Sequence, residues 1–94
     1  MSAATIRIPT PLRSFTGGAD EVTCEGATVG ALLHQLCERY DGLADRIMND
    51  EGGLRPFVNV FLGSEDIRYL DGMDTAVEDG AVLAIIPAVA GGMG

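Results

Sequence analysis

The chain has 94 residues and a mass of 9.8 kDa, which is enough for one small domain. Fourteen acidic residues against six basic ones, all of them arginine, give a net charge of −8, so we expect neither a nucleic-acid partner nor a membrane partner. Because two cysteines make no disulfide scaffold and the N-terminus lacks the basic start and apolar run of a signal peptide, we expect a cytoplasmic protein.

The first half of the chain predicts a hairpin followed by one long helix. Residues 4–9 alternate between apolar and polar, which is typical of a half-buried strand, and residues 12–18 read as a turn region. A second strand is predicted over 20–24, and Thr28 is a suitable N-cap for a helix over 29–40. The apolar residues of that helix recur at helical spacing and form one stripe: Val29, Leu32, Leu33, Leu36, Cys37 and Tyr40.

The second half predicts further strands after a short helical turn. Gly42 stops the long helix, and residues 43–48 form a turn of helix before a polar loop. Strands follow over 57–62, 66–70 and 81–87, separated by glycine-containing turns.

This order of elements predicts an α+β fold of the β-grasp, or ubiquitin-like, type. A hairpin, a helix and then further strands give a mixed sheet of four to five strands with one main helix packed on one face. The first and last strands are expected to lie side by side and parallel in the middle of the sheet. We expect residues 1–87 to form this domain and residues 88–94 to form a flexible tail that carries Gly91-Gly92.

The tail is where we expect the chemistry. Its residues are small, and glycine lacks Cβ, so the main chain around Gly91-Gly92 could approach a nucleotide and a nucleophile through a narrow channel. The alternative is an ordinary frayed C-terminus without a role.

The C-terminal sequence has a recognisable form. The turn Glu78-Asp79-Gly80 leads into a strand, Pro87, three small residues and Gly91-Gly92, and this resembles the end of the MoaD/ThiS family of ubiquitin-like sulfur carrier proteins. The resemblance extends over residues 4–92, and the tail is its most specific part.

The resemblance implies a carrier and not an enzyme. An E1-like adenylyltransferase of the MoeB/ThiF type would use ATP to adenylate the carboxylate of Gly92, and a sulfur donor would displace AMP to leave a thiocarboxylate. A synthase would then accept the sulfur, and the carrier itself would bind no cofactor. The sequence leaves the acceptor open among cysteine, a thiosugar, thiamin, molybdopterin and a sulfur-containing natural product.

Met93-Gly94 departs from the family pattern, in which active members end at Gly-Gly. Gly92 is locked in a peptide bond here and could not be adenylated. We therefore predict that a JAMM-type metalloprotease cuts between Gly92 and Met93. The alternative is that Met93-Gly94 was added for expression.

The body is expected to dock through the face of the sheet that the helix leaves open. We expect five aliphatic residues of the last strands to face the helix: Val58, Val60, Leu62, Leu83 and Ile85. The partner-binding residues are then predicted to be Phe57, Phe61, Ile86, Pro87, Val89 and Ala90. The alternative is the opposite register, with the phenylalanines in the core.

An acidic excess in the second half is expected to lie near the exit of the tail. It comprises Glu65, Asp66, Asp71, Asp74, Glu78 and Asp79. Such charge could steer a basic partner, although solubility alone would account for it.

No metal site is expected. His34 and Cys37 have a spacing that could offer two ligands, but a zinc site needs three or four, and only Cys24 lies near in sequence. We interpret Cys37 as a buried structural thiol.

Two other functions stay open beside the sulfur carrier, which we expect to be a monomer when free. The first is a ubiquitin-like modifier joined through Gly92 to lysines of target proteins. The second is an interaction domain whose tail is inert.

Overall fold

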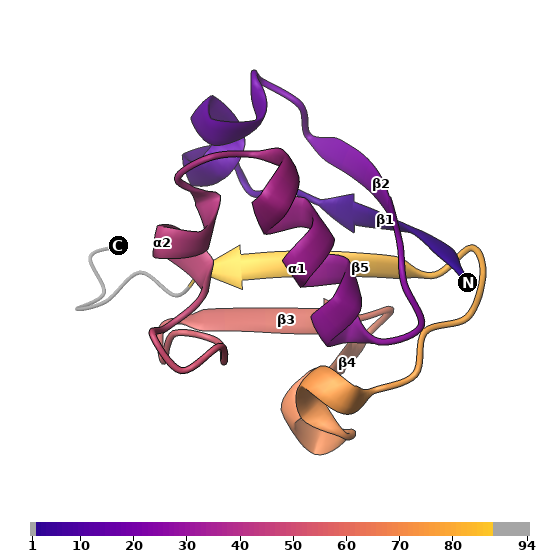
Figure 1. Ribbon diagram of the computed structural model, residues 1–94. Helices are drawn as coiled ribbons and strands as arrows, with labels where there is room; N and C mark the ends of the chain where they lie inside the picture. Colours follow the sequence, from indigo (N-terminus) through magenta and orange to yellow (C-terminus); the bar gives the residue numbers. More distant parts are fainter. Residues whose placement is uncertain (1, 88–94) are drawn as a thin grey trace.

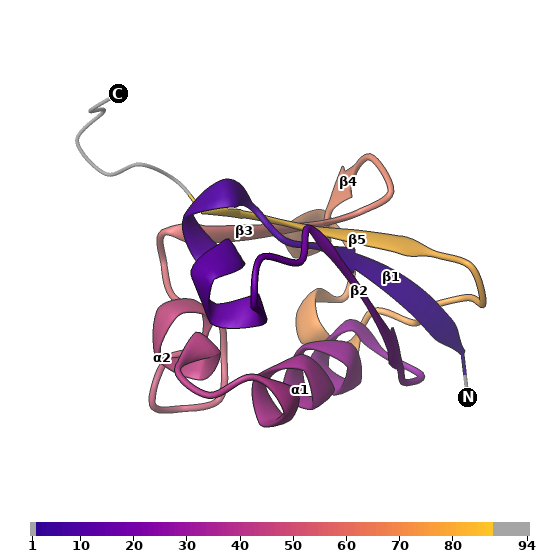
Figure 2. The same ribbon diagram turned by 90° about the horizontal axis from the view of Figure 1, so that it is seen from above.

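The computed structural model describes residues 2–87 and consists of one mixed sheet with helices on one side (Figure 1). The five strands lie in the order β2-β1-β5-β3-β4. Their bounds are β1 Ala3–Arg7, β2 Glu21–Glu25, β3 Val58–Leu62, β4 Glu65–Asp66 and β5 Val82–Pro87. Figure 2 shows that both α-helices lie on the same side of the sheet, so neither helix of the described chain covers the other, uncovered face.

The first and last strands form the centre of the sheet, as predicted. β1 and β5 are parallel, with Ile6 opposite Leu83, while β2 and β3 pair antiparallel on the outer sides of this central pair. A parallel central pair requires a long crossover, and the helical segment between β2 and β3 provides the bulk of it. The predicted β-grasp layout is therefore confirmed.

The main helix α1 runs over Val29–Arg39 and begins at the predicted cap. The Thr28 hydroxyl accepts a hydrogen bond from the Ala31 N–H at 3.2 Å, which satisfies one of the free donors of the first turn. A second helix, α2, covers Leu43–Ile47. Gly42 precedes α2 with a φ of +85°, a conformation that a residue with a Cβ rarely adopts.

The core lies between the helices and the sheet. The apolar side of α1 packs onto the inward side chains of the central strands, and these residues are almost fully buried. The largest fully buried side chains of the core are Ile6, Ile8, Leu32, Leu33, Leu36, Leu43, Ile47, Ile67 and Leu83.

Helix α1 also covers the outer edge of β2. The Gln35 side chain accepts from the Glu25 N–H at 2.8 Å, and the Arg39 guanidinium donates to the Thr23 carbonyl at 3.0 Å. These bonds satisfy backbone groups that would otherwise be free on an edge strand.

Two local predictions were incomplete or wrong. A 3₁₀ helix over Thr10–Thr16, which starts after Pro9, overlaps the region predicted as a turn over 12–18. The strand predicted over 66–70 is wrong, because β4 stops at Asp66 and the chain continues as the 3₁₀ helix Ile67–Tyr69. The Asp66 carboxylate accepts from the Arg68 N–H at 2.9 Å and so caps this helical turn.

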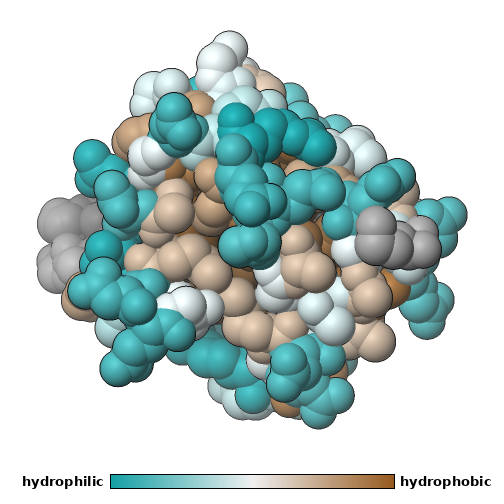
Figure 3. Space-filling view, in the orientation of Figure 1, coloured by the Kyte–Doolittle hydropathy of each residue, from teal (hydrophilic) through white to brown (hydrophobic). Residues whose placement is uncertain are grey.

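The helix-bearing side of the molecule mixes hydrophilic and apolar residues (Figure 3). Among residues 2–87, no helix is both long and apolar enough to cross a membrane.

Candidate functional site

The end of β5 sets the point from which the tail starts. Asn59 lies opposite Ile86 and Val58 lies opposite Pro87, so β3 holds β5 in register up to its last residue. The predicted tail residues Val89, Ala90, Gly91 and Gly92, and the predicted cut before Met93, lie outside the described residues. Their roles, and the division into domain and tail, stay predictions.

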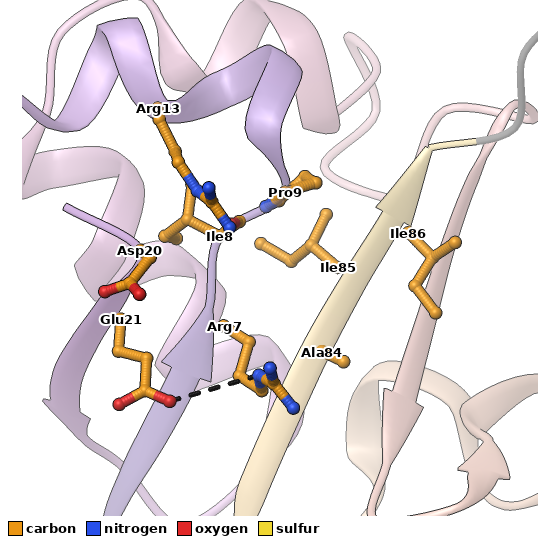
Figure 4. Close-up of a pocket in the computed structure, with 9 residues that line it drawn as sticks. All are labelled: Arg7, Ile8, Pro9, Arg13, Asp20, Glu21, Ala84, Ile85 and Ile86. Carbon is orange, nitrogen blue, oxygen red and sulfur yellow. Dashed lines mark hydrogen bonds and ion pairs between the residues drawn. The ribbon is translucent and has the colours of Figure 1, made fainter. Parts of the chain in front are cut away.

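The alternation of β3 and β5 places the predicted apolar side chains on the two expected faces. Val58, Val60, Leu83 and Ile85 are buried toward the helices, so the alternative register is wrong. Ile86 points the other way and is 46% exposed, and Figure 4 shows Ile85 and Ile86 on opposite sides of β5.

Both predicted phenylalanines are accessible. Phe57, just before β3, is 59% exposed, and Phe61 within β3 is half-buried. Val82, at the start of β5, adds a further exposed aliphatic side chain at 43%. Val82 was not among the partner-binding residues predicted from the sequence, although it shares the alternation of Ile86. A docking role for these residues stays a prediction.

Arg68, which was not among the site residues predicted from the sequence, is fixed on the same face. Arg68 contacts Asp66 through its Nε at 3.3 Å and its Nη2 at 3.0 Å, and Nη2 also donates to the Asn59 side chain. These hydrogen bonds, with the nearby positive charge, lower the pKa of Asp66 from its ordinary value. In the sequence, the spacing of Asp66 and Arg68, two residues apart, could have indicated this ion pair.

A groove of about 300 Å³ lies beside the end of β5 (Figure 4). Arg7 and Arg13 line it together with Pro9 and Ile86. Arg13 is held by a bond of 3.1 Å from its Nε to the Ile8 carbonyl, while Arg7 makes a loose ion pair of 3.9 Å with Glu21.

The predicted position of the acidic excess is wrong. Residues 65–79 form the orange segment at the lower right of Figure 1, whereas β5 ends on the left. Glu65 pairs with Leu62 opposite the start of β5, and the Asp79 carboxylate accepts from the Ala3 N–H at 2.9 Å. The reason is that β5 runs back along the whole sheet before the tail begins, so neighbours in sequence end far apart.

The two cysteine thiols are shielded from solvent to different degrees, and neither forms a disulfide. Cys24 is buried, whereas Cys37, which was predicted to be a buried structural thiol, is only half-buried. Cys37 stands at the side of the apolar stripe of α1 and not at its centre. Burial raises the pKa of both thiols, which makes them weak nucleophiles at neutral pH.

The fold and the uncovered apolar face define a ubiquitin-like β-grasp protein. Comparison with known proteins gives the particular family, because the sequence pattern of the ThiS family matches residues 6–92. The chain belongs to the ThiS family, which confirms the resemblance stated from its C-terminal sequence.

Relatives within this family are named as carriers and modifiers. The chain is 43% identical to the sulfur carrier protein CysO of Mycobacterium tuberculosis over 90 residues, which cover 94% of this chain and 97% of the relative. It is 46% identical to small archaeal modifier protein 3 of Haloferax volcanii over 68 residues, which cover 72% and 73% of the two chains. The stretch from Phe57 to Gly92 predicts a likeness to CysO, and this prediction is confirmed.

A solved structure shares the fold over nearly the whole length. A chain of the crystal structure of the Amycolatopsis orientalis BexX/CysO complex superposes with a TM-score of 0.87 at 42% identity. The match covers 95% of this chain and 99% of that chain.

Proposed function

We propose that the protein is a sulfur carrier whose active C-terminus is Gly92, generated by removal of Met93-Gly94. The observation that carries the proposal is the family match, which ends at residue 92. The 43% identity to the CysO sulfur carrier over most of both chains supports the same function.

The chemistry needs activation of a carboxylate. A free carboxylate is a poor acyl electrophile, so an E1-like enzyme of the MoeB/ThiF type transfers AMP from ATP to Gly92 and releases pyrophosphate. The sulfur donor then attacks the acyl carbon, the bond to AMP breaks, and a thiocarboxylate remains. Its sulfur is a nucleophile that a synthase can use for biosynthesis of cysteine, a thiosugar or another sulfur metabolite.

The remaining partners follow from the same proposal. A JAMM-type metalloprotease removes the last two residues, and the carrier works in the cytoplasm as a free monomer. The body docks on the activating enzyme through Phe57, Phe61 and Ile86, while Pro87, Val89 and Ala90 guide the tail into the enzyme.

Intact-mass measurement of two matched chains tests the proposal. Chains 1–92 and 1–94 are incubated with the activating enzyme of the source organism, ATP and sulfide. We expect only the 1–92 chain to become heavier by one sulfur in place of one oxygen, because only this chain has a free Gly92 carboxylate. A Gly92 amide of the 1–92 chain is the control. Equal behaviour of both chains would contradict the proposal.

A second candidate function is protein modification through the same Gly92. The 46% identity to small archaeal modifier protein 3 favours it. Since the chain has no lysine, lysine adducts would have to appear on other proteins. Tryptic digestion of a native extract should then yield lysines that carry residues 69–92 as a branch, because Arg68 is the last site before Gly92 at which trypsin cleaves.

A further inference from the structure

The uncovered face carries an apolar strip between two arginines. The strip consists of Phe61, Val82 and Ile86, and Arg7 and Arg68 flank it. We propose that this arginine-flanked strip docks the activating enzyme and that the enzyme presents carboxylates on both sides of an apolar centre. The inference rests on the proposed sulfur-carrier function and specifies the surface chemistry of the activating enzyme.

The strand order places one arginine on each side of the strip. Arg7 on β1 lies opposite Ala84 of β5, and Phe61 of β3 lies opposite the same Ala84 on the other side. Because the neighbours Ile6 and Val60 are buried inward, Arg7 and Phe61 both point to the uncovered face. The apolar residues therefore lie between two positive groups on one surface.

Arg68 is already held in place before a partner arrives. The Asp66 side chain that binds it is only 10% exposed, whereas the Arg68 side chain is 59% exposed. Asn59, whose side chain also accepts a hydrogen bond from Arg68, lies opposite Ile86. The guanidinium thus faces solvent next to the strip, and a partner carboxylate could bind it with little further loss of side-chain freedom.

Arg7 is free to exchange its present contact. Its nearest carboxylate, on Glu21, is 3.9 Å away, and both side chains are more than half exposed. Ion pairs of this kind contribute little to stability in water. A carboxylate of the partner could therefore replace Glu21, especially when docking removes water from the strip.

The negative charge elsewhere in the chain makes these two arginines an indication of the charge that the partner carries. The segment 65–79 contains six of the fourteen acidic residues, and Arg68 is its only basic one. A basic partner would be drawn to that segment and away from the end of β5. A partner with carboxylates around an apolar centre instead fits the strip and aligns the end of β5 with its active site.

Charge reversal with a matched control tests the inference. Arg7→Glu, Arg68→Glu and Arg39→Glu each change the net charge equally, but Arg39 lies on α1 and binds the edge of β2. Binding of each 1–92 chain to the activating enzyme of the source organism is measured by calorimetry. We expect Arg7→Glu and Arg68→Glu each to raise Kd by about tenfold or more, and Arg39→Glu by less than about twofold.

The outcomes separate this inference from the proposed function. Equal weakening by all three variants, or by none, while the wild type still forms a thiocarboxylate, would overturn the docking inference alone. A wild-type chain that neither binds nor is adenylated would overturn the proposed function and the inference with it. Because Arg68→Glu also leaves Asp66 without its positively charged partner, thermal melts check whether the Arg68→Glu chain is folded. If it is unfolded, the Kd of Arg7→Glu decides the result.

Discussion

At the scale of single residues, Asp66 links folding stability to the uncovered face. Its carboxylate caps the 3₁₀ helix after β4 and binds the Arg68 guanidinium. Asp66→Asn keeps an oxygen for the cap but removes the charge. We expect this variant to melt a few degrees below the wild type at pH 7, because the ion pair with Arg68 is lost.

The pH dependence of this loss has a defined sign. Arg68 lowers the folded pKa of Asp66 below the ordinary value of 3.8, so the charged form stabilises the fold above about pH 4. This contribution disappears as the pH falls through the folded pKa. The difference in melting temperature should therefore shrink toward about pH 2. Glu65→Gln, at the exposed neighbour, is the control, and a constant difference across the pH range would contradict the assignment.

At the scale of elements, the alternation of β5 predicts opposite results for two adjacent residues. Leu83 is fully buried against the helices, whereas Val82 is 43% exposed on the other face. We expect Leu83→Ala to lower the free energy of unfolding by about 2–5 kcal/mol. Val82→Ala should cost less than about 1 kcal/mol, because it leaves no cavity. Urea unfolding measures both, and similar losses would mean that the register of β5 is wrong.

The elements also show where sequence patterns predict structure and where they fail. Long periodic segments were predictable: Thr28 marks the start of α1, and the alternation around Ile86 gives the exposed face. The short elements were not, because one hydrogen bond from the Arg68 N–H to the Asp66 carboxylate caps a 3₁₀ helix where a strand was expected.

The candidate site was predictable where it depends on alternation and was missed where it depends on contacts between distant segments. Ile86 and Phe61 follow from the pattern of their own strands. Arg7 joins them only because β1 pairs with β5, and Arg68 only because the chain folds back over Asn59. Such pairings between distant segments are not encoded in local periodicity.

At the scale of the whole molecule, negative charge is unevenly distributed. Residues 65–79 carry six acidic side chains and one arginine, so this segment repels itself. Glu78 is exposed in the turn before β5, next to Asp79. Replacing Glu78 by lysine removes one repelling charge and adds an attracting one. We expect Glu78→Lys to raise the free energy of unfolding by a few tenths of a kcal/mol in low salt.

Salt and a matched substitution separate this charge effect from a local one. At 0.5 M NaCl the interaction between exposed charges is screened within a few ångströms, so most of the gain from Glu78→Lys should disappear. Glu51→Lys makes the same change in net charge in the loop before Arg55, outside the acidic segment, and should stabilise the fold less. Urea unfolding of both variants at two salt concentrations measures the difference. Equal gains would mean that only the total charge of −8 matters, whereas a larger gain at Glu78 that disappears in salt would mean that its distribution in the fold matters.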